Sequence, residues 1–210
     1  MGHKRVLAVL AAATSLGVGA AVTTVVQKAG AAEPFALVTL RTADGAAVGY
    51  ATFRNDPGQP ATTVAVYIDV REDTTPVRTF RGFHVHANDN PDNGVGCVAD
   101  PAQPATTWFT SADGHLKEGT DTHGAHKGDM PSIFLNQNGK AIATFTIDRF
   151  TPAELVNRAV ILHAGADNFG NVPVGTAADQ YTANSPSALT ATQNTGNAGS
   201  RYACGVVVLL

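Results

Sequence analysis

Histidine is the side chain whose spacing in this sequence most directly suggests chemistry, because imidazole is a common protein ligand for transition metals. His84 and His86 alternate with apolar residues in the segment Phe83–His86. If this segment is a β-strand, the two imidazoles project from the same face and lie side by side. A His-x-His pair alone is a weak signal, since two polar residues on a solvated sheet face give the same pattern.

A second group of candidate ligands lies within residues 115–129. It supplies three imidazoles and one carboxylate, from His115, His123, His126 and Asp129. Four nitrogen and oxygen ligands on one loop suit a tetrahedral zinc site, because zinc accepts both kinds of donor. A polar surface loop with chance histidines is the alternative. The chain has only seven histidines in 210 residues, so the clustering favours a metal site.

His163 directly follows the apolar run Ala159–Leu162. Taken alone, a histidine at the end of a strand is more often satisfied by backbone groups than by a metal. Together with His84 and His86, however, it would complete an imidazole-rich site. Such a site suits copper as well as zinc.

Short runs of alternating apolar and polar residues indicate the elements that must position these ligands. They predict eight strands, at 35–41, 47–54, 62–70, 79–87, 132–136, 140–148, 158–164 and 202–209. Eight short strands suit a β-sandwich or a small closed barrel. The one convincing helix start is Thr151–Glu154, a capping box with Pro at the first helical position, and we expect a helix of about two turns there.

Two connections, 88–131 and 165–200, are much longer than ordinary turns. Loops of more than about 15 residues in a compact domain are usually functional or disordered. The first contains the ligands of residues 115–129, and the second begins beside His163 and ends beside Arg201. We therefore expect the functional site where these two loops cover the barrel.

The N-terminus has the pattern of a secretory signal peptide over residues 1–32. A basic start is followed by an uncharged apolar stretch at 6–26 and by small residues at 29–32. A retained membrane anchor is the alternative, because a spanning helix needs about 20 apolar residues. The pattern favours cleavage, which leaves residues 33–210 as the folded domain.

The charge composition of the chain argues against nucleic-acid binding. The chain has 14 basic and 17 acidic residues, for a formal net charge of −3. Loss of residues 1–32 removes Lys4, Arg5 and Lys28 but no acidic residue, and brings the charge to −6. Proteins that bind nucleic acids usually present a basic face, so we expect no nucleic-acid partner.

Five stretches of the sequence match one known family in its own order. They are 82–86, 114–115, 128–131, 160–168 and 196–206. On these residues the sequence resembles the secreted bacterial-type copper/zinc superoxide dismutases. The resemblance implies an all-β fold, an eight-stranded antiparallel Greek-key β-barrel or sandwich with two long functional loops.

The resemblance also implies a ligand set for two metal ions, copper and zinc. Copper would be bound by His84, His86, His115 and His163. Zinc would be bound by His115, His123, His126 and Asp129, with His115 bridging the two ions. Asp167 matches the family's carboxylate that links a copper histidine to a zinc histidine, and such a contact fixes ring orientation.

Two further features follow from the resemblance. Arg201 matches the family's substrate-guiding arginine, and a guanidinium near the copper can orient a small anion by charge-assisted hydrogen bonds. Cys97 and Cys204 match the family's intrasubunit disulfide, which export would permit. The loop between Cys97 and Cys204 would have roughly 100 residues, for which the chain-entropy model gives about 4 to 5 kcal/mol.

The implied activity is conversion of superoxide to O₂ and hydrogen peroxide, by alternate reduction and oxidation of the bound copper. Arg201 and His115 would be the catalytic residues. The implied location is secreted or in the cell envelope or periplasm, with no stable membrane partner after the leader is removed. The oligomeric state stays open, with a homodimer among the options. The alternative function is a non-catalytic copper- and zinc-binding module of the same fold.

The anion-steering residues of many relatives have no direct counterpart between His163 and Arg201, where the sequence has no Lys or Arg. Lys117 and Lys127 are candidate substitutes, although a role in solubility explains their positions equally well.

Overall fold

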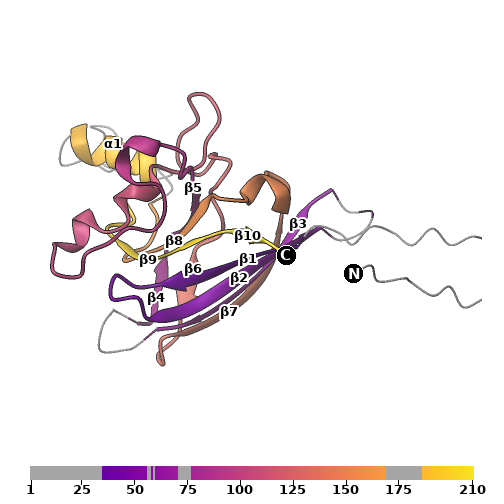
Figure 1. Ribbon diagram of the computed structural model, residues 1–210, viewed down its shortest axis with the longest axis horizontal. Helices are drawn as coiled ribbons and strands as arrows, with labels where there is room; N and C mark the ends of the chain where they lie inside the picture. Colours follow the sequence, from indigo (N-terminus) through magenta and orange to yellow (C-terminus); the bar gives the residue numbers. More distant parts are fainter. Residues whose placement is uncertain (1–34, 56–57, 59, 71–76, 169–185) are drawn as a thin grey trace, which may run out of the picture. The chain divides into compact units, whose positions relative to one another are not determined.

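The computed structural model describes residues 35–55, 58, 60–70, 77–168 and 186–210 (Figure 1). The predicted signal peptide, residues 1–32, lies outside the described residues, so its prediction is not tested. Within the described part of the chain, no helix is long and apolar enough to cross a membrane.

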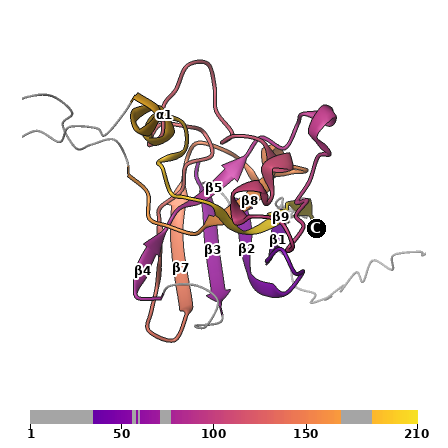
Figure 2. The same ribbon diagram turned by 90° about the vertical axis from the view of Figure 1, so that its left-hand side faces the viewer.

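An antiparallel, curled β-sheet forms the body of the domain. Its strand order is β5-β8-β9-β1-β2-β3-β7, with β10 also paired to β1. The bounds are β1 Phe35–Arg41, β2 Ala47–Asn55, β3 Thr62–Asp69, β5 Phe83–His86, β7 Lys140–Ile147, β8 Ala159–His163, β9 Arg201–Val206 and β10 Val208–Leu209. Figure 2 shows β1, β2, β3 and β7 side by side. β9 returns to lie beside β1, next to the β1-β2-β3 meander, which is the Greek-key arrangement.

A two-stranded ribbon of β4, Thr79–Arg81, and β6, Ile133–Leu135, accompanies the sheet. The prediction of an all-β antiparallel fold is therefore confirmed. Two predicted strands are each divided in the structure. The one at 79–87 becomes β4 and β5, and the one at 202–209 becomes β9 and β10.

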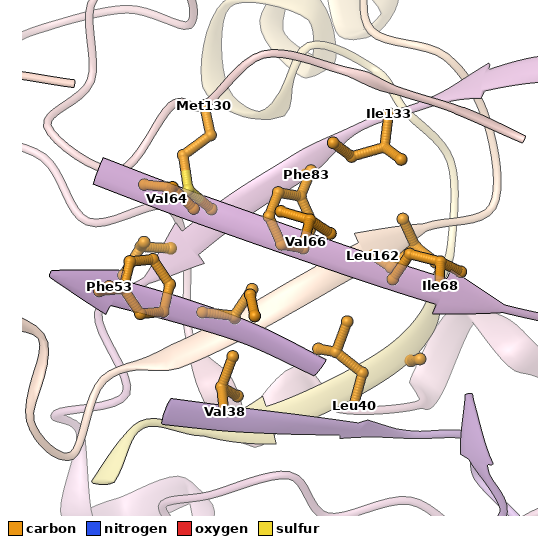
Figure 3. Packing of buried hydrophobic residues seen from close by; sticks show 14 of the residues in the cluster. Val38, Leu40, Phe53, Val64, Val66, Ile68, Phe83, Met130, Ile133 and Leu162 are labelled. Carbon is orange, nitrogen blue, oxygen red and sulfur yellow. The ribbon is translucent and has the colours of Figure 1, made fainter. Parts of the chain in front are cut away.

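The hydrophobic core is formed mainly by buried side chains of the sheet strands (Figure 3). Val64, Val66 and Ile68 alternate along β3 and are at most 2% exposed, while the residues between them face outward. They pack with Phe83 of β5 and Leu162 of β8. The alternation that predicted these strands is therefore the alternation of core and surface.

β8 is buried on both faces. Its residues Val160 and Leu162 belong to the main core, whereas Ile161 packs in a second cluster with Phe109 and Cys204. This second cluster lies under the first long connection. The disulfide between Cys97 and Cys204 joins that connection to β9, with a Cα–Cα distance of 5.6 Å.

The predicted helix at Thr151 is shorter than expected. The capping box is present, and the Thr151 N–H donates to Glu154 Oε2 at 2.7 Å. However, the helix is a 3₁₀ turn, Pro152–Leu155, because Val156 already has extended backbone angles that lead towards β8. The prediction of two helical turns was wrong.

The long connections contain helical structure that the sequence patterns did not indicate. The first holds three 3₁₀ turns, Pro91–Asn93, Ala105–Thr107 and Thr110–Ala112. The second holds the helix α1, Pro186–Thr195. In Figures 1 and 2, α1 and the 3₁₀ turns lie at the end of the sheet where β5 is found.

Candidate metal centre

β5 supplies the first two ligands, and the first long connection folds back against it. His84 and His86 are both fully buried, so the alternative of a solvated sheet face is excluded. Single backbone bridges pair His84 with Asp129 and His86 with His115. On the other side of β5, the register with β8 places His84 opposite Ile161. Ligands from distant parts of the chain therefore meet along one short strand.

Four imidazoles form a group that we call the four-histidine group. Its members are His84, His86, His115 and His163. All are at most 4% exposed, and one ring nitrogen from each lies within 4.8 Å of the others. The ring centroids of His84 and His115 are 4.1 Å apart, and those of His86 and His163 are 5.6 Å apart.

In each ring of this group, one nitrogen contacts a protein oxygen and the other does not. Among the described residues, one buried nitrogen of each ring has neither a hydrogen-bond partner nor an ion-pair contact: His84 Nδ1, His86 Nε2, His115 Nε2 and His163 Nε2. The other nitrogen of each ring faces an oxygen. His86 Nδ1 lies 2.8 Å from the Asp113 carbonyl, and His163 Nδ1 lies 3.4 Å from the Gly199 carbonyl. Such contacts fix the tautomer and leave the opposite nitrogen able to bind a metal.

The surroundings of three of these rings, His86, His115 and His163, favour their neutral form. Burial lowers the pKa of His86 and His163 well below the ordinary value, and the neighbouring histidines and Arg201 lower it further. Burial also lowers the pKa of His115 to about 4, although Asp129 opposes this shift. Neutral imidazole is the form that coordinates metals.

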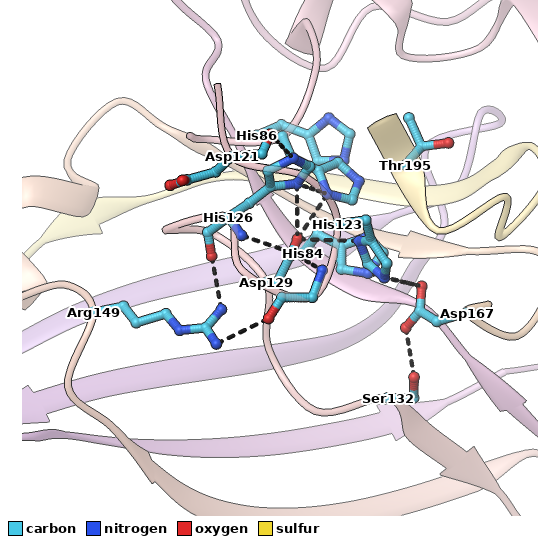
Figure 4. A network of polar contacts seen from close by, with 12 residues as sticks. His84, His86, Asp121, His123, His126, Asp129, Ser132, Arg149, Asp167 and Thr195 are labelled. Carbon is cyan, nitrogen blue, oxygen red and sulfur yellow. Dashed lines mark hydrogen bonds and ion pairs between the residues drawn. The ribbon is translucent and has the colours of Figure 1, made fainter. Parts of the chain in front are cut away.

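A second cluster, which we call the mixed group, is built around one carboxylate oxygen (Figure 4). Its members are His115, His123, His126 and Asp129. Asp129 Oδ1 lies 2.8 Å, 3.3 Å and 3.4 Å from the Nδ1 atoms of His115, His123 and His126. Burial would raise the pKa of Asp129, but hydrogen bonds from His115 and His123 hold it well below its usual range.

A ligand atom of His84 also lies within 4.8 Å of His115, His123 and Asp129, but the ring contacts of His126 fit the mixed group better. His84 Nε2 already contacts Asp167, and its Nδ1 is one of the open nitrogens of the four-histidine group. His126 Nε2 contacts the Asp121 carbonyl at 3.0 Å, while its Nδ1 lies 3.3 Å from His115 Nδ1. The Nδ1 atom of His126 is therefore the one directed at the mixed group.

Asp167 contacts one histidine of each group. Its Oδ1 lies 2.9 Å from His84 Nε2 and 3.6 Å from His123 Nε2. Its Oδ2 accepts a hydrogen bond from Ser132 Oγ at 2.5 Å. Gly196 makes room for this contact, because a Cβ there would lie 2.4 Å from His123 Nε2 and its φ of +63° favours glycine.

Arg201 lies at the start of β9, paired with His163 of β8. Its guanidinium is partly buried and donates to two backbone carbonyls, those of Phe109 and Asp113. The residue is thus fixed by the first long connection at the margin of the four-histidine group.

The two candidate steering lysines differ in their surroundings. Lys127 Nζ forms ion pairs with Glu118 at 2.9 Å and Glu154 at 2.8 Å. Its charge is therefore offset locally. Lys117 is exposed, and the described residues give it no ion pair.

Several residues that position the site had no sequence signal. Arg149 donates to the carbonyls of His126 at 2.8 Å and Gly124 at 3.0 Å, which anchors the loop of the mixed group (Figure 4). The His123 N–H donates to the Gln193 carbonyl of α1 at 2.6 Å. The carbonyls of Phe109 and Asp113 also belong here. Because every residue has a backbone carbonyl, the residues whose carbonyls position the site cannot be identified from their side-chain types.

Comparison with known proteins places the chain among named relatives. Residues 47–207 match a family model described as copper/zinc superoxide dismutase. A "Superoxide dismutase [Cu-Zn]" of Mycolicibacterium paratuberculosis is 34% identical over 201 residues, covering 91% of this chain and 79% of that protein. Its counterpart in Mycobacterium tuberculosis is 34% identical over 179 residues, 80% of this chain and 68% of that protein. The Photobacterium leiognathi protein of the same name is 30% identical over 135 residues, 61% of this chain and 64% of that protein.

Proposed function

The chain belongs to the copper/zinc superoxide dismutase family, and from this premise we propose which of its residues hold the metals and which receive the substrate. The enzyme is an oxidoreductase that converts superoxide to O₂ and hydrogen peroxide. The assignment of individual residues is our proposal.

The observation that carries the proposal is that four buried histidines each have one ring nitrogen with no hydrogen-bond or ion-pair partner in the described structure, and that ligand atoms of the four rings lie within 4.8 Å of one another. Leaving several buried polar atoms unsatisfied is costly unless a ligand completes them. A set of four imidazoles suits copper. We therefore assign the copper ion to His84, His86, His115 and His163.

The mixed group fits zinc. Three Nδ1 atoms and one carboxylate oxygen form a closed set of four donors, which is the composition of a tetrahedral zinc site. The low pKa of Asp129 keeps its carboxylate charged. We assign the zinc ion to His115, His123, His126 and Asp129, with His115 common to both sets because its two nitrogens face different groups.

We propose separate catalytic roles for the residues in and around the four-histidine group. When bound, copper supplies the redox chemistry, in which one superoxide gives up an electron and a second accepts it. Arg201 attracts and orients the anion. Carbonyl groups accept from two of its five N–H donors and fix the guanidinium, while its positive charge and its other N–H donors can act on the anion. His115 Nε2 can hold a proton that peroxide formation requires. Asp167 orients His84 and His123 together.

We also propose that residues 1–32 are removed on export to the cell envelope or beyond. The sequence pattern of the leader supports this. The Cys97–Cys204 disulfide gives independent support, since disulfides persist in oxidising compartments. Mass spectrometry of the protein from fractionated cells tests the cleavage, and sedimentation of the product tests whether it is a homodimer.

The non-catalytic alternative is not favoured. A storage module has no need for a cation fixed beside its copper site, yet Arg201 is held there by two hydrogen bonds.

Metal analysis of single variants tests the ligand assignment. His86→Ala is expected to lose copper and keep zinc, whereas Asp129→Asn is expected to lose zinc first. Asp100→Asn, an exposed change in the same connection, is the matched control and keeps both ions. Equal loss of both metals in His86→Ala and Asp129→Asn would contradict two separate sites.

A further inference from the structure

Asp113 adopts a backbone conformation that side chains other than glycine rarely adopt. Its φ is 64° and its ψ is −161°. This region of the conformational map is used almost only by glycine. The next residue in the chain is Gly114, so the sequence places an aspartate where a glycine would be free of strain. Something in the surrounding structure must hold Asp113 in this conformation.

The conformation directs one carbonyl at two side chains of the proposed copper site. The Asp113 carbonyl lies 2.8 Å from His86 Nδ1 and accepts a hydrogen bond from the Arg201 guanidinium. The first contact sets the ring orientation of His86, and the second sets the position of Arg201. A rotation of this single peptide group would disturb both.

The side chain of Asp113 is bonded in the opposite direction, to the turn that follows β5. Its Oδ2 accepts from the backbone N–H groups of Asp89 at 2.8 Å and Asn90 at 3.0 Å. Its Oδ1 accepts from Asn93 Nδ2. The turn is itself anchored, because Arg158 pairs with Asp89 at 2.7 Å. Three donors on a fixed turn therefore hold the carboxylate.

We propose that Asp113 is a positioning residue. Its carboxylate binds the 89–93 turn through the three bonds that we call the clamp, and this fixes the Asp113 backbone carbonyl where it can orient the His86 ring and the Arg201 guanidinium. The inference rests on the proposed roles of those two residues. It assigns to the side chain a function beyond that of the backbone. A glycine at 113 would reach the same φ without strain. It would lack the three bonds that keep the peptide from rotating.

The choice of variants follows from that contrast. Asp113→Gly keeps access to the conformation and removes the clamp. Asp113→Asn keeps most of the clamp, because an amide oxygen can accept from both backbone N–H groups and Asn tolerates positive φ. Asp92→Asn is the matched control, since it removes an exposed carboxylate of the same turn that makes no side-chain contact in the described structure.

The primary measurement is made by NMR on the full protein with zinc and reduced copper, which is diamagnetic. Exchange of the His86 Nδ1–H with solvent and the order of the Arg201 Nε–H report the two contacts directly. We expect Asp113→Gly to speed the exchange about tenfold and to increase the mobility of Arg201, the effect of losing bonds to a charged group. Asp92→Asn is expected to match the wild type, and Asp113→Asn, which loses only the bond from Asn93, is expected to speed the exchange by about threefold.

Azide, a small anion, provides a second measurement on the oxidised protein. Its affinity for the copper site is expected to fall about tenfold in Asp113→Gly, through the loosened Arg201, and to be restored in Asp113→Asn. Wild-type behaviour of Asp113→Gly in both measurements would overturn the proposal, because backbone conformation alone would then suffice.

If Asp113→Gly fails to fold, Asn93→Ala provides the test, since it removes one of the three bonds from an exposed residue. An increase of about threefold in His86 N–H exchange is expected, and no change would overturn the clamp. Failure of the proposed function is separate, because it would appear in the wild type as absent copper or absent superoxide removal. The NMR comparison can then be repeated with zinc alone.

Discussion

At the scale of single residues, the site depends on oxygen atoms that each contact two or three partners. Asp129 Oδ1 faces three imidazoles, Asp167 Oδ1 faces His84 and His123, and the Asp113 carbonyl faces His86 and Arg201. Each shared oxygen couples the orientations of the groups that contact it. A change at one of these oxygens is therefore expected to affect all of its partners.

Asp167 provides the clearest case. We expect Asp167→Asn to weaken zinc binding by about ten- to hundredfold, because it loses the charge that faces His123 and the acceptor that fixes His84. Competition with a zinc chelator measures the change. Ser132→Ala removes only the hydrogen bond to Oδ2 and is expected to have a smaller effect. Unchanged zinc affinity in Asp167→Asn would show that the carboxylate does not link the two groups.

Arg201 is expected to act on the rate and not on metal content. Arg201→Ala should keep both ions, slow superoxide removal, and make the rate less sensitive to salt, since a fixed cation near the copper acts on an approaching anion. Arg201→Lys keeps the charge but loses the planar pair of donors to Phe109 and Asp113, so an intermediate rate is expected. Stopped-flow kinetics at several salt concentrations distinguish these variants. A rate in Arg201→Ala equal to the wild type would refute guidance by this residue.

At the scale of elements, the strands were predicted well because their sequences alternate between apolar residues that face the core and polar residues that face the surface. β1 has its predicted bounds, and β2, β3 and β7 differ from theirs by a single residue. The candidate ligands were selected from the sequence by side-chain type, because metals bind only a few types of side chain. By contrast, α1 lacks a strong apolar face, and the 3₁₀ turns are held by backbone and side-chain contacts from elsewhere. These elements depend on tertiary structure, so local patterns did not reveal them.

The first long connection is held to the sheet by the disulfide and by hydrogen bonds. Cys97 and Cys204 are 107 residues apart in sequence, and the neighbouring Val98 carbonyl accepts from the Phe109 N–H at 2.8 Å. We expect Cys97→Ser with Cys204→Ser to lower the free energy of unfolding by about 4 to 5 kcal/mol, from loop-closure entropy. Denaturant unfolding measures this value. The same double variant should also mobilise Arg201, because Phe109 is one of its two acceptors.

At the scale of the whole molecule, the net charge and the substrate have the same sign. The chain has a charge of −3, and removal of residues 1–32 would make it −6. We therefore expect the attraction of superoxide to depend on local cations, for which we propose Arg201, and not on the net charge of the molecule. Lys127 contributes little to this local field because two glutamates offset its charge.

Metal binding is expected to contribute strongly to the stability of the whole domain. Six histidines and Asp129 are buried in the domain, and several of their ring nitrogens have no protein partner. Metal ions that bind these groups only in the native state stabilise that state by mass action. Removal of both ions by a chelator should lower the denaturation midpoint, and zinc alone should restore part of the loss. A midpoint that does not respond to either ion would contradict the assignment of the buried groups as ligands.

The most direct test of the account is to measure metal content and superoxide removal on the same purified protein. The account predicts that each chain binds one copper and one zinc ion, and that superoxide is consumed in proportion to the copper bound. Full occupancy by copper without removal of superoxide would contradict it.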